Sequence, residues 1–195
     1  MPYIPLENHL PGVTGLLEYS RETGDALRQL TQVLLRGPSS LSEAERELIA
    51  ALVSHKNNCT FCATSHTAAA DAFLGEHETS KKVKRDFRSA PVGEKLKALF
   101  VIALMVCDGG KSVTPSIITK AKREGATDRE IHDTVLIAAM FCMYNRYVDG
   151  LATEAPTDPE FYRTMADRLK KNGYHRPQHG YDHLQKPDME RNSQN

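Results

Sequence analysis

The sequence predicts an all-α protein, folded as a bundle of antiparallel helix hairpins. Apolar residues recur with a helical period along most of the chain, and no run of β-favouring residues alternates over the length of a strand. Short turn-forming segments separate the helical stretches, which makes neighbouring helices antiparallel. The 195 residues suffice for one core. We therefore expect a single helical domain over residues 1–172 and a polar C-terminal tail over residues 173–195.

The first helices are marked by their apolar pattern and by their ends. Apolar residues spaced for one helix face run from 16 to 35, and the turn-forming segment 37–40 breaks the pattern. Ser42 with Glu45 three positions later is a capping-box signature, so a second helix should begin there. Its apolar pattern continues to about Lys56.

The next helix should contain the cysteine pair. The asparagines at 57–58 interrupt the preceding helix, and either can cap a helix that starts at Cys59. This helix should run to Leu74, where Gly75 provides a C-cap. The charged segment 76–88 is compatible with a helix or a loop, and its lysines and arginines fit a solvated face.

The second half of the chain continues the helical pattern. A strongly apolar helix is expected over 93–107, a short one over 114–124, and a long one over 127–150 that begins with a second capping box. A last amphipathic helix should span 158–171. Beyond residue 173 the chain lacks the apolar content to fold alone, so the tail is either disordered or an arm that packs on a neighbouring subunit.

Composition and the length of the apolar stretches bear on the expected partners and location. Lysine and arginine number 25, as do aspartate and glutamate, so the balance gives no reason to expect nucleic acid or an anionic membrane as a partner. The apolar stretches 98–107 and 135–144 are too short to span a bilayer. The first residues lack the pattern of a signal peptide. We expect a cytoplasmic protein, where a CxxC pair is more often catalytic or metal-binding than structural.

One constellation of residues indicates redox chemistry. Cys59, Cys62 and His66 are spaced so that they share one face of a helix. Glu47 lies on the preceding helix and can face them across a hairpin. A carboxylate that orients an imidazole, which in turn deprotonates a thiol, is the arrangement of an activated nucleophile. The thiolate is the form that attacks peroxides and disulfides.

These residues resemble a known family. The pattern Glu47-x11-Cys59-x2-Cys62-x3-His66 resembles the signature of the alkylhydroperoxidase D / carboxymuconolactone decarboxylase superfamily, and the run 141–151 is similar to its peroxidase-related branch. The resemblance covers roughly residues 10–155. It implies an alkylhydroperoxidase D-like all-α fold and a homo-oligomer, often a trimer or hexamer. It also implies an antioxidant peroxidase, an oxidoreductase that needs no cofactor or metal beyond a redox-active Cys59–Cys62 disulfide.

The resemblance also assigns roles to single residues. It implies that Cys62 is the peroxidatic cysteine, Cys59 the resolving cysteine, His66 the base and Glu47 the proton-relay carboxylate. The substrate would be a hydroperoxide, and a lipoyl group or a thioredoxin-like protein would be the dithiol reductant. The chain departs from the family pattern between the two cysteines, where Thr60-Phe61 stands in place of a further histidine. His55 is a candidate to replace it.

The choice of the attacking sulfur depends on two opposed effects. The start of a helix stabilises anions and favours the thiolate of Cys59. The contact between positions i and i+4 places His66 next to Cys62. A positioned base removes the proton directly, whereas the helix end only biases the pKa. We therefore expect Cys62 to be the nucleophile.

Other functions remain open from sequence. A non-catalytic redox sensor would carry the same reversible disulfide. A carboxymuconolactone decarboxylase-like enzyme is disfavoured, because members with that activity generally lack the CxxC pair. A zinc-stabilised binding module is a third alternative, with Cys59, Cys62, His66 and His55 as ligands. Cys107 and Cys142 lie in apolar helical runs, where core packing is the expected role.

Overall fold

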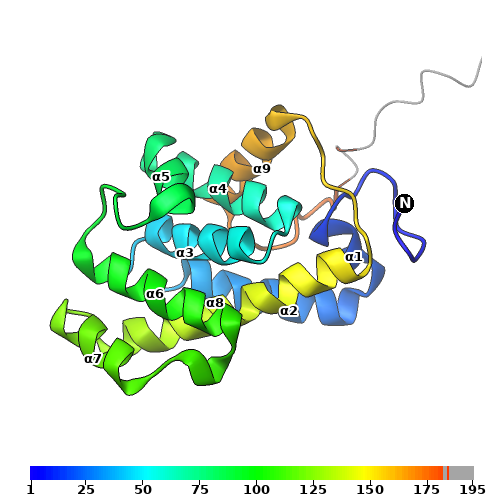
Figure 1. The fold of residues 1–195 in the computed structure, drawn as a ribbon. Helices are drawn as coiled ribbons and strands as arrows, with labels where there is room; N and C mark the ends of the chain where they lie inside the picture. Colours follow the sequence, from blue (N-terminus) through cyan, green and yellow to red (C-terminus); the bar gives the residue numbers. More distant parts are fainter. Residues whose placement is uncertain (182–183, 185–195) are drawn as a thin grey trace, which may run out of the picture.

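The computed structural model describes residues 1–181 and 184, and this part of the chain contains helices and no strand, which confirms the predicted all-α fold (Figure 1). The α helices are α1 (Val13–Tyr19), α2 (Arg21–Arg36), α3 (Glu43–Lys56), α4 (Thr60–Leu74), α5 (Glu78–Asp86), α6 (Glu94–Asp108), α7 (Pro115–Arg123), α8 (Asp128–Gly150) and α9 (Pro159–Asn172). A short 3-10 turn, η1 (Gly110–Ser112), lies between α6 and α7.

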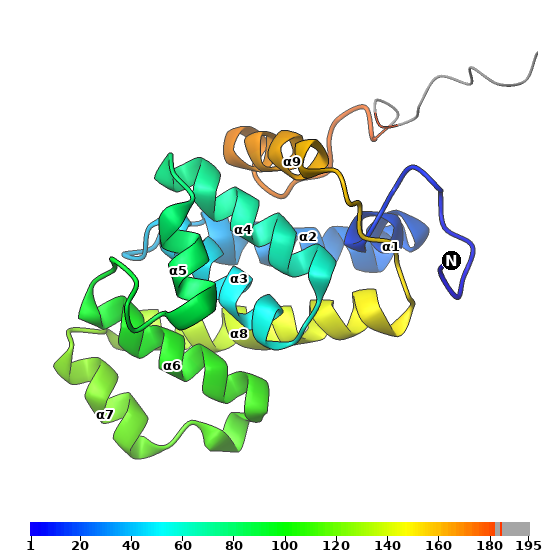
Figure 2. The same cartoon turned by 45° about the horizontal axis from the view of Figure 1, so that its top comes forward.

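Helix α3 lies at the centre of the bundle. It forms an antiparallel hairpin with α4, and it also packs against α6 and α8 (Figure 2). Helix α9 covers the other side of α4, so α4 is enclosed between α3 and α9. This arrangement surrounds the cysteine-containing start of α4 with other helices.

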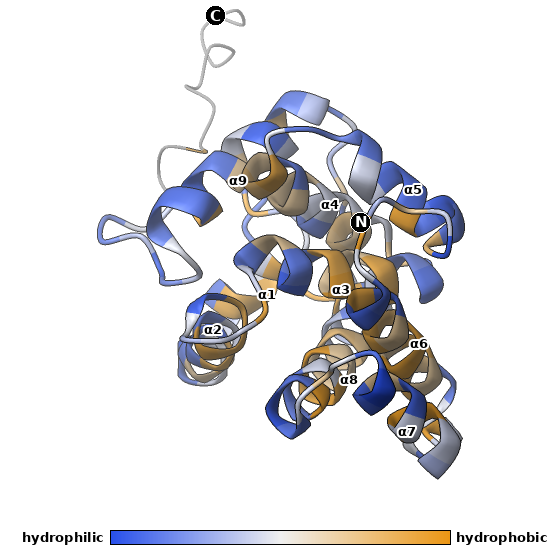
Figure 3. Cartoon of the chain, turned by 90° about the vertical axis from the view of Figure 1, so that its left-hand side faces the viewer, coloured by the Kyte–Doolittle hydropathy of each residue, from blue (hydrophilic) through white to orange (hydrophobic). Residues whose placement is uncertain are grey.

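The apolar core runs along α3, α6 and α8. These helices carry hydrophobic residues toward one another, whereas α5 and α9 present hydrophilic faces outward (Figure 3). Leu99, Phe100 and Ile102 of α6 are fully buried. A second apolar cluster contains Leu16, Phe61 and Val148 and surrounds the two cysteines of the CxxC pair. The dithiol is therefore part of a packed interior.

The first helical segment differs from the prediction. The sequence pattern predicted one helix over 16–35, but the structure breaks it at Ser20, whose backbone is extended (φ −125°, ψ 93°). Gly24 explains the break, because a Cβ at this position would overlap the carbonyl group of Leu17. The close approach folds α1 back against the start of α2. A pattern of apolar residues carries no signal for such a contact.

The start of α4 also needs a correction. Cys59 does not begin the helix but occupies the N-cap position, with φ −81° and ψ 100°. Neither asparagine caps α4, since Asn58 adopts a left-handed conformation (φ 59°) that turns the chain between the two helices. The predicted capping boxes at Ser42 and Thr127 are both present. The charged segment 76–88 is helical over most of its length, as α5.

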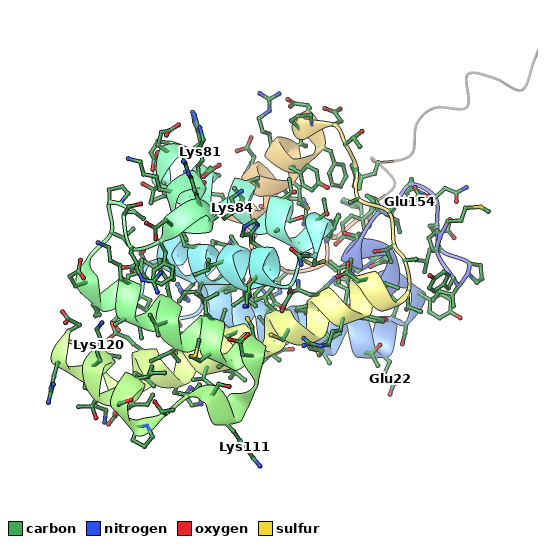
Figure 4. All side chains as sticks on the ribbon, in the orientation of Figure 1. Glu22, Lys81, Lys84, Lys111, Lys120 and Glu154 are labelled. Atoms are coloured by element: carbon green, nitrogen blue, oxygen red, sulfur yellow. The ribbon has the colours of Figure 1, made fainter. Side chains whose placement is uncertain are left out.

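The outer surface of the helical bundle carries charged side chains. Figure 4 labels six such side chains, and Lys111 and Lys120 among them are exposed and point away from the helices. None of the helices in the described part of the chain is long and apolar enough to cross a lipid bilayer.

The chain continues past α9 and returns to the body of the protein. Gly173 has a positive φ of 66°, and a Cβ there would overlap the side chain of Gln32. The backbone N–H of Tyr174 then donates to Gln32 Oε1 at 2.7 Å. Farther along, Arg176 forms an ion pair with Glu18 at 3.0 Å. The predicted domain boundary at residue 172 stays a prediction, and most of the tail after Tyr181 lies outside the described residues.

Candidate active site

A buried carboxylate and an imidazole meet across the α3–α4 hairpin. Glu47 is fully buried on α3, and its Oε2 lies 2.7 Å from Nδ1 of His66 on α4. The hairpin brings these two side chains together over 19 positions of sequence. The ring edge of His66 also packs on Phe141 of α8, with 4.3 Å between ring centroids. The imidazole is therefore held on two sides.

Two further side chains complete the surroundings of Glu47. Arg36, at the end of α2, donates from Nη2 to Glu47 Oε1 at 2.6 Å. The hydroxyl group of Tyr174 donates to the same oxygen at 2.6 Å. The guanidinium group of Arg36 also lies over the rings of Phe73 and Tyr174, at 4.6 and 4.8 Å from their centroids. A buried carboxylate thus has three donors and one compensating positive charge.

These contacts determine which atoms of Glu47 and His66 carry a proton. Burial would raise the pKa of Glu47, but His66, Arg36 and Tyr174 more than offset it, so the pKa lies below its usual value. An ionised carboxylate can only accept hydrogen bonds, so Nδ1 of His66 must carry a hydrogen. In the neutral imidazole, Nε2 is then the proton acceptor. Burial and the charge of Glu47 raise the pKa of Tyr174 well above its usual value, which keeps its hydroxyl group protonated.

The two cysteines lie side by side at the start of α4. Both are reduced and buried, with 0% of Cys59 and 3% of Cys62 exposed. A hydrogen bond from the Cys62 thiol lowers the pKa of Cys59 despite its burial. The same interaction, together with burial, raises the pKa of Cys62. Negative charge is therefore favoured on Cys59, at the helix N-cap, while Cys62 holds its proton at rest.

A cavity of about 80 Å³, partly open to the surface, reaches Cys62 and His66 but not Cys59. Its wall is largely apolar, formed by aliphatic and aromatic side chains that include Val13, Leu17, Phe61, Phe141 and Leu169. Tyr174 and Tyr181, from the segment after α9, line the cavity as well. A small apolar molecule that enters this space would contact the Cys62 sulfur and the imidazole together. Cys62 is thus the sulfur that shares a cavity with the base.

His55 lies apart from this arrangement. It is exposed, and it lines a separate surface hollow with Cys59 and Lys84 rather than the cavity that contains His66. It does not take the place of the missing histidine in the Glu47–His66 pair. Among the described residues there is also no group of three or more histidine, cysteine or acidic side chains placed to hold a metal ion. The structure therefore gives no support to the zinc alternative.

Sequence reasoning selected Glu47, Cys59, Cys62 and His66, and it missed Arg36 and Tyr174. Arg36 ends an amphipathic helix, where a basic residue is common. Tyr174 falls in the segment that the composition identified as a polar tail. The one available signal was the Gly173–Tyr174 pair directly after a predicted helix, which marks a turn followed by a large side chain.

Comparisons with known proteins agree with this fold. Residues 21–77 match the model of the carboxymuconolactone decarboxylase family. The comparison with curated proteins gave no match.

Among solved structures, an uncharacterized peroxidase-related protein from Silicibacter sp. TM1040 is 25% identical, with a TM-score of 0.71 over 78% of each chain. An uncharacterized peroxidase-related protein from Ralstonia eutropha JMP134, described as an alkylhydroperoxidase AhpD core, is 22% identical, with a TM-score of 0.72 over 80% of each chain.

A protein of unknown function from Agrobacterium tumefaciens, proposed to be the antioxidant defence protein AhpD, has the same fold. It is 19% identical, with a TM-score of 0.62 over 75% of this chain and 99% of that one. The family match covers α2, α3 and α4, and therefore includes Glu47, both cysteines of the pair and His66. The family match over residues 21–77 and the similar folds support the resemblance of this chain to the alkylhydroperoxidase D / carboxymuconolactone decarboxylase superfamily.

Proposed function

We propose that the protein is a thiol-dependent hydroperoxidase that uses the Cys59–Cys62 pair as its redox centre. The observation that carries this proposal is the cavity shared by Cys62 and His66, behind which Glu47 hydrogen-bonds to the imidazole. A dithiol, a base and a carboxylate that orients the base are the groups that peroxide reduction by thiols requires. The peroxidase-related and antioxidant descriptions of similar structures support the same reaction.

The first step would use His66 as the base. Nε2 takes the proton of the Cys62 thiol, and the thiolate attacks the terminal oxygen of the hydroperoxide. The O–O bond breaks, and the departing alkoxide takes the proton back from His66 to leave as an alcohol. Cys62 becomes a sulfenic acid. Glu47 stabilises the imidazolium that forms during this transfer, through its 2.7 Å contact with Nδ1.

The second step would use the charge distribution between the two sulfurs. The lowered pKa of Cys59 supplies a thiolate next to the sulfenic acid. This thiolate attacks the Cys62 sulfur, a disulfide forms, and the leaving hydroxide takes a proton from solvent to become water. A dithiol donor, such as a lipoyl group or a thioredoxin-like protein, then reduces the disulfide by two thiol–disulfide exchanges.

Access and electrostatics favour different sulfurs as the nucleophile. The pKa values favour a thiolate on Cys59, but Cys59 is fully buried and borders the surface hollow of His55 rather than the cavity that contains the base. Cys62 reaches the cavity and lies one helical turn from His66. We assign the attack to Cys62, because the hydroperoxide must contact the sulfur that it oxidises, and the base can remove the proton at that moment.

The test is hydroperoxide consumption with dihydrolipoamide as the donor. Wild-type protein should turn over repeatedly with tert-butyl hydroperoxide, and Cys62→Ser should abolish turnover. Cys107→Ser is the matched control outside this site and should retain activity. Full turnover by Cys62→Ser would overturn the proposal. Circular dichroism of each variant verifies that the helical fold is intact.

One observation favours a redox sensor as the second candidate. Both sulfurs are almost completely buried, and the raised pKa of Cys62 slows its reaction with peroxide. A sensor would form the Cys59–Cys62 disulfide once per oxidation and would not consume excess hydroperoxide. The same assay separates the two functions, because only an enzyme consumes many equivalents of peroxide per subunit while the dithiol donor is present.

Three other expectations stay predictions. The dithiol counts against a carboxymuconolactone decarboxylase-like reaction, although the matching family model bears that name. Assembly into a trimer or hexamer, and a cytoplasmic location, rest on the sequence resemblance and on composition.

A further inference from the structure

A second pair of thiols lies outside the candidate active site. Cys107 is in the last turn of α6, and Cys142 is in the middle of α8, which packs along α6 (Figure 1). The end of α3 contacts both places: Lys56 pairs with Asp108, the neighbour of Cys107, at 3.3 Å, and Asn57 donates to Cys142 Sγ at 3.4 Å. The interaction between the two sulfurs also contributes to a raised pKa of Cys107. Both are only partly buried, in contrast to Cys59 and Cys62. A small solute can therefore reach them.

The surroundings of this second pair are polar. Nδ2 of Asn57 donates to Cys142 Sγ at 3.4 Å and to Asn145 Oδ1 at 2.8 Å. Asn145 is itself 1% exposed and donates to Ser54 Oγ at 3.1 Å. Asn57 is the C-cap of α3, so this polar cluster lies at the turn of the α3–α4 hairpin. Cysteines that serve only as small hydrophobic residues would not require such donors.

The hydrogen bonds distinguish the two sulfurs. The Cys107 thiol donates to the carbonyl oxygen of Ala103 at 3.4 Å, while Cys142 accepts from the amide of Asn57. An N–H donor stabilises negative charge on the sulfur that accepts it. Burial and the neighbouring Cys142 raise the pKa of Cys107 to about 12, so Cys107 keeps its proton. We therefore assign the attack to Cys142, because Cys107 retains its proton.

We propose that Cys107 and Cys142 form a second redox-active dithiol, which hydroperoxides oxidise to a disulfide. The Cys142 thiolate attacks the terminal oxygen of the hydroperoxide, the O–O bond breaks, and the alkoxide takes a proton from water to leave as an alcohol. The Cys107 sulfur then attacks the Cys142 sulfenic acid and loses its proton, and hydroxide leaves with that proton as water. Two thiols and one hydroperoxide give one disulfide, one alcohol and one water.

The Cys107–Cys142 pair differs from the candidate active site in how its proton is removed and in how fast it should react. No histidine–carboxylate pair adjoins Cys142 among its hydrogen-bond partners in the described part of the chain, so the proton passes to solvent. The reaction should be slower than that of Cys62 and should respond to sustained oxidant. Oxidation would link α6 to α8 covalently, beside the polar cluster that contains Asn145.

The experiment uses the full chain with both active-site cysteines replaced, as Cys59→Ser/Cys62→Ser. This variant contains two thiols, Cys107 and Cys142. Treatment with excess tert-butyl hydroperoxide should reduce the titratable thiols from two to none, and peptide mass spectrometry should find a Cys107–Cys142 cross-link. Adding Cys142→Ser to this background should prevent the cross-link and leave the Cys107 thiol titratable.

Two results would contradict the proposal of a second redox-active dithiol. Thiols that stay reduced, or that gain oxygen atoms separately without a cross-link, would overturn it. If the double variant does not fold, peptide mapping of oxidised wild-type protein tests the same cross-link. The result does not depend on the proposed peroxidase function, because the double variant lacks its redox centre.

Discussion

Tyr174 shows how much a single side chain can contribute to the candidate site. Its hydroxyl group is one of three donors to the buried Glu47 carboxylate, and its ring covers the guanidinium group of Arg36. Without the hydroxyl donor, the pKa of Glu47 should rise toward its usual value, because one stabilising contact to the charged form is lost. Glu47 must be ionised to hold the His66 tautomer, so the acidic side of the pH–rate profile depends on this contact.

We therefore expect Tyr174→Phe to reduce peroxide turnover roughly tenfold, the equivalent of a hydrogen bond to a charged group. The acidic limb of its pH–rate profile should shift to higher pH. Tyr19→Phe is the matched control, since Tyr19 is 59% exposed. A lower rate with no shift of the profile would mean that Tyr174 only packs against its neighbours.

Tyr162 gives a contrasting prediction. Its hydroxyl group is buried near both active-site cysteines, and it has no hydrogen-bond partner among the described residues. Burial, with the charges of Cys62 and Cys59, raises its pKa to about 12. Removing an unpaired buried hydroxyl group relieves a desolvation cost. Tyr162→Phe should therefore leave the free energy of unfolding unchanged or slightly increased, as measured by urea unfolding.

Tyr144→Phe provides the comparison for this measurement. The Tyr144 hydroxyl group lies 2.8 Å from Thr31 Oγ1 and donates to the carbonyl oxygen of Leu27 at 3.1 Å. Its removal should cost about 1 kcal/mol, because Leu27 and Thr31 lose a partner in a buried environment. Equal effects of the two substitutions would contradict the interpretation of Tyr162.

At the scale of secondary-structure elements, Glu130 joins three parts of the chain. It completes the capping box of α8, accepts from Ser40 before α3, and pairs with Lys95 of α6 at 2.7 Å. Burial opposes ionisation, but these hydrogen bonds lower the pKa of Glu130 from 4.5 to about 2. A carboxyl group whose pKa is lowered by folding stabilises the fold at pH values above its pKa in the unfolded chain. This contribution is lost as the pH falls through the pKa of the folded protein.

Glu130→Gln should therefore lower the free energy of unfolding near neutral pH, by about 3 kcal/mol at most. Glutamine can still cap the helix, so the difference in the free energy of unfolding between the variant and wild type reports on the charge of Glu130. The difference from wild type should shrink as the pH falls from 4.5 to about 2. Glu94→Gln is the control, because that carboxylate is exposed and, among the described residues, pairs only with Lys97. A constant difference across this pH range would refute the role of ionisation.

The elements that the sequence predicted well are those whose signals are local. Capping boxes at Ser42 and Thr127 and the asparagines at 57–58 indicated the α3–α4 hairpin and the start of α8. The hairpin in turn allowed Glu47 to be placed opposite the cysteine helix. The break at Ser20 was missed because it depends on the contact of Gly24 with Leu17, a tertiary contact that no periodicity records.

At the scale of the whole molecule, the segment after α9 closes the candidate site. Tyr174 binds Glu47, Arg176 pairs with Glu18 of α1, and Tyr181 lines the cavity. Removing residues 173–195 should open the cavity further to solvent and reduce turnover at least as much as Tyr174→Phe does. Removing residues 185–195 retains all of these contacts and serves as the control. Unchanged turnover in the longer deletion would show that the site does not need the segment.

The two site residues that the sequence did not reveal, Arg36 and Tyr174, share one property. Arg36 and Tyr174 reach Glu47 over 11 and 127 positions of the chain, and neither belongs to a spaced motif. A motif is visible when its members lie on one hairpin, as Glu47, Cys59, Cys62 and His66 do. A hydrogen-bond donor that is distant in sequence, such as Tyr174, is recognised only in the three-dimensional structure, because composition alone assigns it to a polar tail.

The position of Tyr174 also sets an order of events during protein synthesis. The ribosome produces α3 and α4, with the dithiol and the imidazole, well before it produces the tyrosine that completes the Glu47 site. Domains fold as their residues emerge, so a nascent chain contains both thiols before the closing segment exists. The candidate site is therefore assembled last, and only in a chain that has been translated past residue 174.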